Sequence, residues 1–185
     1  MQKILDNLCI DSKSTLIISS PELLEETIDE IIDMCIKGNN LPTIYISLNK
    51  TYRSMEETLK KKGIKNDFIF FIDCITKNGE MKHERNVYYI EDPSDLTKIG
   101  ITVGQILNII TGRKVLVIDE LKTLLFYNDL ETVVKFVRSI IGQAQNFSSN
   151  VCIITTEDKK LIDSVEGIFD KIIRMDVYHP IKHLR

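Results

Sequence analysis

Carboxylate and hydroxyl side chains close several apolar runs of this sequence, and these are the side chains best suited to chemistry. Asp119 ends the run "VLVID" and is followed by Glu120, while Thr155 and Thr156 end the run "VCIITT". An aspartate in this position can hold a metal ion, and it can equally serve as a structural or helix-capping residue. Both interpretations remain open for Asp119 from its local sequence.

A second candidate site lies in the stretch "TLIISSPELLEETIDEIIDMCIKG", where an apolar run breaks directly into an amphipathic helix. A phosphate-binding turn of this kind uses glycines, whose backbone N–H groups converge on the phosphate, and a lysine that neutralises it. This chain has Pro21, Glu25 and Glu26 there instead. Pro21 suits the first turn of a helix and Ser20 suits its N-cap, so we expect the helix to begin early and occupy the turn. A carboxylate about 4 Å from a phosphate would add about 4 kcal/mol of repulsion at an effective dielectric constant of about 20.

The elements that position these residues alternate along the chain. Six mostly continuous apolar runs are predicted as strands that are buried on both faces: Thr15–Ser19, Thr43–Leu48, Phe68–Asp73, Lys114–Asp119, Val151–Thr155 and Lys171–Met175. Amphipathic segments between them are predicted as helices. This order indicates a doubly wound α/β domain with a parallel sheet, in which ligands bind beyond the carboxyl ends of the strands.

Five helices are expected, and several carry signals for their ends. Glu22–Lys37 is followed by Gly38 as a stop, and Thr51–Lys62 is shorter and more polar. Ser94 is predicted to cap the third helix, which Gly112 ends, and Asn128 with Glu131 resembles a capping box for the fourth. The fifth is expected at Lys159–Ile168, and Thr155, Thr156 or Glu157 could cap it.

Length and composition predict one domain over residues 1–185, with a hairpin or loop excursion at 76–93 around the Asn78-Gly79 turn. The net charge of −3 argues against nucleic-acid binding, which usually needs a strongly basic face. We find no secretory leader and no apolar run long enough to span a bilayer, so a cytoplasmic location without membrane attachment is expected. The four cysteines lack any C-x-x-C pairing, which argues against a zinc site.

Several strings, in this order, resemble the RecA/KaiC-like branch of the P-loop ATPases. "KVLVIDELKTLL" is similar to the Walker B strand of that branch, "VCIITTED" to its following strand, and "EDPSDLTKIGITVGQILNIITGRKVLVIDE" to the helix that leads into Walker B in archaeal KaiC-like proteins. The likeness covers nearly the whole chain. It implies a RecA-like three-layer α/β/α sandwich with a mostly parallel central sheet.

The resemblance also assigns positions to the family's nucleotide-binding residues. Counted from the end of the first strand, Ser20 falls on the first glycine of the family's G-x-x-x-x-G-K-[ST] loop, Glu25 on the second, Glu26 on the lysine and Thr27 on the final hydroxyl. Only the hydroxyl is kept. The resemblance therefore implies a degenerate Walker A loop.

Three further positions follow from the resemblance. Asp119 matches the Walker B aspartate that holds magnesium, and Thr155 lies in the polar tip that faces the γ-phosphate or a neighbouring subunit. The family's catalytic glutamate would fall at about Asn49 and Lys50, where this chain has no carboxylate and where a solvent-exposed turn is expected. A general base at that position is therefore not predicted.

These observations predict a RecA/KaiC-like domain with lost or weakened nucleotide binding, acting as a regulatory or assembly module. No cofactor is expected, and the partner is expected to be a second copy or a RecA/KaiC-like relative, which the acidic helix could contact. One alternative is an ATPase that binds Mg-ATP through Asp119, Thr27 and a lysine from elsewhere, with Lys50 the nearest candidate. Another is an accessory protein of DNA recombination or repair, which the acidic composition argues against.

Overall fold

The chain folds around one central β-sheet, which the computed structural model describes for residues 11–64, 66–77, 84–175 and 182–183. The order of the strands is β4-β3-β2-β5-β6-β1-β7-β8. β1 to β7 are joined by parallel pairs, and β8 pairs antiparallel with β7. The strands are β1 Ser14–Ser19, β2 Thr43–Ser47, β3 Ile69–Asp73, β4 Val87–Tyr89, β5 Lys114–Ile118, β6 Ser149–Thr156, β7 Lys171–Met175 and β8 Lys182–His183.

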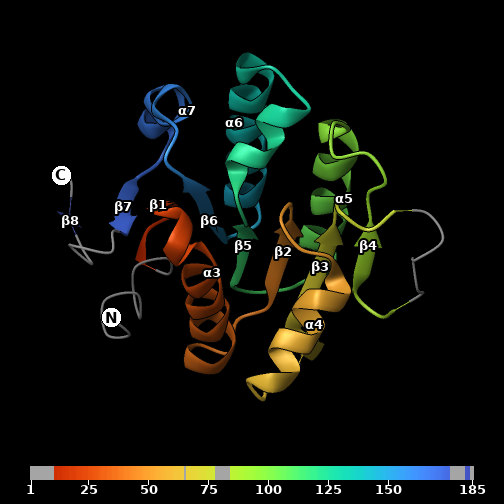
Figure 1. Ribbon diagram of the computed structural model, residues 1–185. Helices are drawn as coiled ribbons and strands as arrows, with labels where there is room; N and C mark the ends of the chain where they lie inside the picture. Colours follow the sequence, from red (N-terminus) through yellow and green to blue (C-terminus); the bar gives the residue numbers. More distant parts are fainter. Residues whose placement is uncertain (1–10, 65, 78–83, 176–181, 184–185) are drawn as a thin grey trace.

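Helices cover both faces of the sheet, which confirms the predicted α/β sandwich (Figure 1). α3 (Leu24–Asp33) and α4 (Tyr52–Lys61) lie on one face, and α5 (Leu96–Ile109), α6 (Leu130–Asn146) and α7 (Lys159–Val165) lie on the other. Alternate residues of the central strands enter the two cores. In β1, for example, Ile17 packs on the α3–α4 side, whereas Leu16 and Ile18 pack on the α5–α7 side. This burial on both faces explains the continuous apolar runs of the sequence.

The first helix begins where the sequence predicted. A 3₁₀ turn at Pro21–Leu23 (η1) follows Ser20 directly and leads into α3, so helical structure fills the turn after β1. Ser20 occupies the N-cap position, but its side chain makes no capping hydrogen bond, which corrects the role expected for it. A π-helical turn at Met34–Gly38 (η2) ends the segment, close to the predicted stop.

Aspartates cap the later helices, and here three predicted caps are wrong. Asp95 accepts a hydrogen bond from the N–H of Lys98 in α5, and Asp158 accepts one from the N–H of Leu161 in α7. The predictions had placed these caps at Ser94 and within Thr155–Glu157. Each true cap is the next residue along the chain, an aspartate whose side chain accepts from an N–H of the first turn.

α6 shows the same displacement. Asp129, not Asn128, caps it by accepting from the N–H of Thr132 at 2.8 Å. The side chain of Asn128 instead donates to the carbonyl of Leu124 in the preceding 3₁₀ turn, Leu121–Phe126 (η4). Asn128 therefore belongs to the end of that turn rather than to the start of the helix.

The segment at 76–93 contributes β4, which joins the edge of the sheet in parallel to β3. It therefore adds an edge strand through an excursion rather than through a hairpin with β3. Residues 78–83, which include the expected Asn78-Gly79 turn, lie outside the described residues. None of the helices in the described ranges is long and apolar enough to cross a membrane.

Candidate functional site

Asp119 lies at the carboxyl end of β5 and is completely buried. One oxygen of its carboxylate accepts hydrogen bonds from the hydroxyls of Tyr45 (2.6 Å) and Ser47 (3.3 Å), and the other accepts from the N–H of Leu48. These partners come from β2 and the turn after it. Asp119 therefore joins the ends of two neighbouring strands, and both of its oxygens are already engaged.

Burial dominates the electrostatics of this carboxylate. Removal from water raises the pKa of Asp119 to about 6, although the hydrogen bonds from Tyr45, Leu48 and Ser47 act to lower it and Glu120 adds repulsion. The pKa of the Tyr45 phenol is also raised, first by its own burial and then by the adjacent Asp119 charge. The charged form of Asp119 is thus costly in this position, and the donors around it offset only part of that cost.

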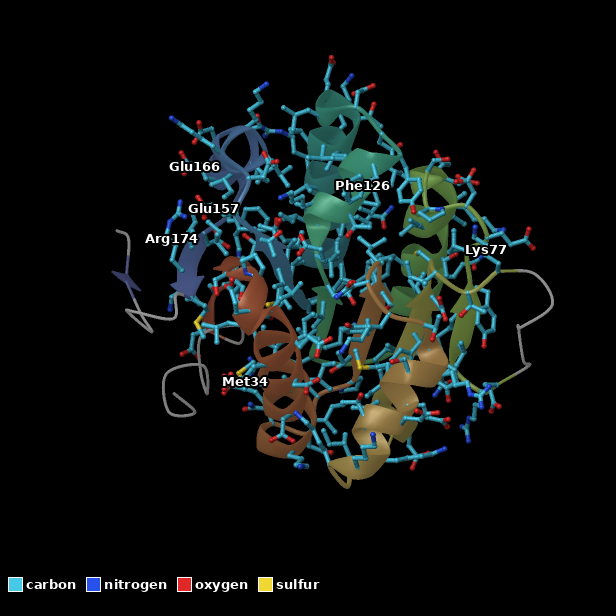
Figure 2. The ribbon with its side chains drawn as sticks, viewed as in Figure 1. Met34, Lys77, Phe126, Glu157, Glu166 and Arg174 are labelled. Carbon is cyan, nitrogen blue, oxygen red and sulfur yellow. The ribbon has the colours of Figure 1, made fainter. Side chains whose placement is uncertain are left out.

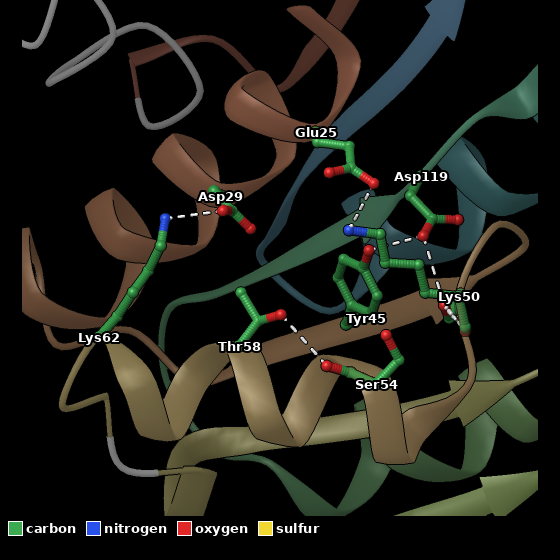
Figure 3. A network of polar contacts seen from close by, with 9 residues as sticks. Glu25, Asp29, Tyr45, Lys50, Ser54, Thr58, Lys62 and Asp119 are labelled. Atoms are coloured by element: carbon green, nitrogen blue, oxygen red, sulfur yellow. Dashed lines mark hydrogen bonds and ion pairs between the residues drawn. The ribbon is translucent and has the colours of Figure 1, made fainter.

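Lys50 extends over the same region from the turn between β2 and α4. Its ammonium lies 3.0 Å from the carboxylate of Glu25 on α3, and its side chain is 21% exposed. Figure 3 shows this ion pair beside the bond between Tyr45 and Asp119. The prediction of a solvent-exposed turn at Asn49 and Lys50 is therefore wrong for Lys50. Its side chain is mostly buried and reaches Glu25 on α3.

Asp73 holds this turn in place from the end of β3. Its buried carboxylate accepts four hydrogen bonds: from the N–H of Tyr52 (2.6 Å), the N–H of Ile75 (2.8 Å), and the N–H and hydroxyl of Thr76 (2.8 and 2.6 Å). Tyr52 is the first residue of α4. Asp73 therefore fixes the start of α4 and, through it, the position from which Lys50 extends.

The predicted Walker A positions differ in their surroundings. The hydroxyl of Thr27 is buried in α3 and lies 3.2 Å from the hydroxyl of Ser19. Glu26, the position matched to the lysine, is exposed on the surface of α3. The backbone N–H of Ser20 donates to the carbonyl of Met175 at 3.0 Å, which ties the turn to β7.

Thr155 lies beside Glu120, a residue for which the sequence predicts no role. The carboxylate of Glu120 accepts from the N–H of Thr156 at 3.1 Å and from the hydroxyls of Thr156 and Thr155 at 3.3 and 3.5 Å. Glu120 is buried and has a positive φ of 45°, a conformation that costs energy in a non-glycine residue. The carboxyl ends of β5 and β6 are thereby joined by hydrogen bonds between their own residues.

A surface cavity of about 350 Å³ lies beside this cluster, at the ends of β1 and β7. Its lining includes Ser20, Pro21, Glu157 and Arg174. Arg174 and Glu157, both labelled in Figure 2, form an ion pair at 2.8 Å. The hydroxyl oxygen of Ser20 is buried there without a hydrogen-bond partner. Among the predicted site residues, Ser20 alone lines this cavity.

Sequence reasoning missed Tyr45 and the pairing of Glu25 with Lys50. The signal for Tyr45 was its place as the one aromatic residue in the aliphatic strand "TIYIS". No group of three or more His, Cys, Asp or Glu side chains that could hold a metal ion occurs among the residues described. The magnesium role of Asp119 remains a prediction.

The strand order and the two helical layers define the class of the fold as a RecA-type α/β sandwich. Among solved structures, the chain is similar to a KaiC-like protein from the hyperthermophilic archaeon Pyrococcus horikoshii OT3, with a TM-score of 0.60 and 13% sequence identity. The match covers 94% of this chain and 79% of that one. No protein-family profile matches the sequence, and no curated protein matches it. The KaiC-like fold expected from the sequence is thus confirmed.

Proposed function

We propose that this chain is a non-catalytic member of the KaiC-like fold class that acts as a regulatory or assembly module. In this proposal its own side chains occupy the region where relatives of this fold bind nucleotide. The observation that carries it is the polar cluster of Asp119, Tyr45, Lys50 and Glu25, in which each charged group already has a partner within the chain.

The fit of Mg-ATP to these residues is poor. The turn after β1 contains no glycine, and its backbone is wound into η1 and α3, so its N–H groups do not form an open cradle. Glu25 and Glu26 bring negative charge to the positions that would face phosphate. The carboxylate of Asp119 is buried and already accepts hydrogen bonds from Tyr45, Ser47 and Leu48, so it is poorly placed to bind a hydrated magnesium ion.

A second candidate function, an ATPase with an unusual phosphate site, draws support from Lys50. Its ammonium does reach the first turn of α3, which follows β1 and η1, because it contacts Glu25 at 3.0 Å. In that alternative Glu25 would hold the lysine until a nucleotide displaces it. The two functions make different predictions for a variant that releases Lys50.

We expect Glu25→Gln to change the free energy of unfolding by less than about 1 kcal/mol, because Glu25 is 73% exposed and such ion pairs contribute little. We also expect no nucleotide-dependent rise in Tm for the wild type, Glu25→Gln or Lys50→Met in millimolar Mg-ATP, since a ligand that binds the folded state must raise Tm. A rise that is larger in Glu25→Gln and absent in Lys50→Met would instead show nucleotide binding through Lys50, which the ATPase alternative requires.

A further inference from the structure

The cavity at the ends of β1 and β7 lies where the topology of the sheet favours a ligand. β1 and β6 are neighbouring parallel strands. β1 continues into α3 on one face of the sheet, whereas β6 continues into α7 on the other face (Figure 1). Ligands of parallel α/β sheets bind beyond the carboxyl ends of two strands whose connections diverge in this way. The volume of the cavity, about 350 Å³, is that of a small-molecule site.

The wall of this cavity contains one charge of each sign. Arg174 on β7 and Glu157 after β6 both line it. Among the contacts of the described residues, their ion pair joins one guanidinium nitrogen, Nη1, to one carboxylate oxygen, Oε2. A guanidinium has further N–H donors and a carboxylate has a second oxygen, so both groups can bind a ligand as well as each other.

A hydroxyl without a partner belongs to the same wall. The hydroxyl oxygen of Ser20 is buried and has no hydrogen-bond partner within the part of the chain that the structure describes. Buried hydroxyls are nearly always paired with protein, water or a bound molecule. Ile18 and Pro21 add apolar carbon atoms to the lining. The cavity therefore offers two opposite charges, a hydroxyl and an apolar surface.

We propose that this cavity binds a free α-amino acid. The proposal rests on the regulatory role proposed above, for which the amino acid is the effector. The carboxylate of the ligand accepts hydrogen bonds from the guanidinium of Arg174 and the hydroxyl of Ser20. Its ammonium donates to the carboxylate of Glu157, and its side chain packs on Pro21.

The charges of the wall favour a zwitterion over a ligand with a single charge. A phosphate or a simple carboxylate would be attracted by Arg174 but repelled by Glu157, and an amine would meet the reverse. An α-amino acid has its two charged groups on one carbon, so they lie close together as the guanidinium and the carboxylate do. The charges around the cavity are also balanced: Lys122 donates to the carbonyl of Glu157, and Glu22 is exposed next to Pro21.

The ion pair between Arg174 and Glu157 can open to admit the ligand. The side chain of Glu157 is 61% exposed, and ion pairs of this kind contribute little to stability. An inserted amino acid replaces one ion pair by two, and it gives the hydroxyl of Ser20 an acceptor. Binding therefore depends on both charged side chains, and removal of either one should weaken it.

The Tm of the full chain with added amino acids tests the site. The probes are L-leucine, L-serine, L-phenylalanine, L-glutamate and L-lysine, each at about 10 mM, where a Kd of about 1 mM raises Tm by about 3 °C. We expect at least one probe to raise Tm. Its N-acetyl derivative, which lacks the ammonium, and its amide, which lacks the carboxylate, should bind at least tenfold more weakly by calorimetry. No rise with any of the probes, or equal binding of the N-acetyl derivative, overturns the proposal.

Substitutions test whether the amino acid lies in this cavity. Arg174→Gln and Glu157→Gln should each bind the active probe at least tenfold more weakly. Lys160→Gln is the matched control, because Lys160 is an exposed cation on α7 that does not line the cavity, and it should bind as the wild type does. Circular dichroism without ligand checks that each variant is folded. Unchanged binding in Arg174→Gln, or tighter binding in Glu157→Gln, contradicts the arrangement.

The two proposals can fail separately. The amino-acid experiments contain no nucleotide, whereas binding of Mg-ATP decides the proposed function. A chain that binds Mg-ATP but no amino acid would refute both, and one that binds neither would refute only the amino-acid site.

Discussion

Asp119→Asn is expected to stabilise the protein at pH 8 by about 2 kcal/mol. The folded-state pKa of Asp119 is about 6, against an ordinary value of 3.8. Each unit of that shift corresponds to about 1.4 kcal/mol by which folding disfavours the charged form. Asparagine keeps an oxygen for the N–H of Leu48, and the hydroxyls of Tyr45 and Ser47 can turn to accept from its amide. The loss of a good acceptor for Tyr45, about 1 kcal/mol, reduces the gain.

The stability difference between Asp119→Asn and the wild type should depend on pH. Because the folded-state pKa is raised, the stability of the wild type contributed by Asp119 is fully present below about pH 4 and is lost as the pH rises through 6. The advantage of Asp119→Asn should therefore appear between pH 4 and 6 and level off above. Urea unfolding at pH 4 and pH 8 measures it, with the exposed Asp163→Asn as a control. An advantage that does not depend on pH, or a less stable variant at pH 8, would show that the desolvation argument is wrong.

Asp73→Ala is expected to be the most destabilising of the substitutions considered, by about 3–5 kcal/mol. It leaves three backbone N–H groups and one hydroxyl without their acceptor in a buried position, and each such group typically costs about 1–3 kcal/mol, less where water can enter. Since Asp73 fixes the start of α4, the ion pair between Lys50 and Glu25 should loosen as well.

The midpoint of urea unfolding measures the effect of Asp73→Ala, provided that the slope of the transition is unchanged. Asp73→Asn is the matched variant. It retains one oxygen and should lose roughly half as much stability. A loss below about 1 kcal/mol in the alanine variant would mean that water readily replaces the carboxylate and that the turn does not depend on it.

The sheet could be predicted from the sequence because its strands are buried on both faces. A run such as "KVLVI" lacks the alternating polar residues of a strand with one solvent-exposed face, which predicts burial on both faces. β5 and β7 fall within a residue of their predicted bounds. Helix ends were less predictable. At α5 and α6 a serine or an asparagine stood next to an aspartate, and the sequence alone did not decide which of the two neighbouring residues would cap the helix.

The positions of the site residues could be predicted from the sequence, but the contacts between their side chains could not. Asp119 and the rewritten turn after β1 could be located from the carboxyl ends of the predicted strands. The contacts of Tyr45 and Lys50 could not, because they join residues that lie 74 and 25 positions apart in the sequence. Only the register of β2 against β5 places the Tyr45 hydroxyl beneath Asp119, and only the packing of α4 beside α3 brings Lys50 to Glu25.

Isothermal titration calorimetry of ATP and ADP with magnesium tests the central claim most directly. The proposed occupation of the site by Lys50, Glu25 and Tyr45 predicts no binding heat for the wild type up to millimolar nucleotide, and the same result for Asp119→Ala. Micromolar binding by the wild type that is abolished in Asp119→Ala would contradict the account and show that this chain binds nucleotide without a glycine-rich loop.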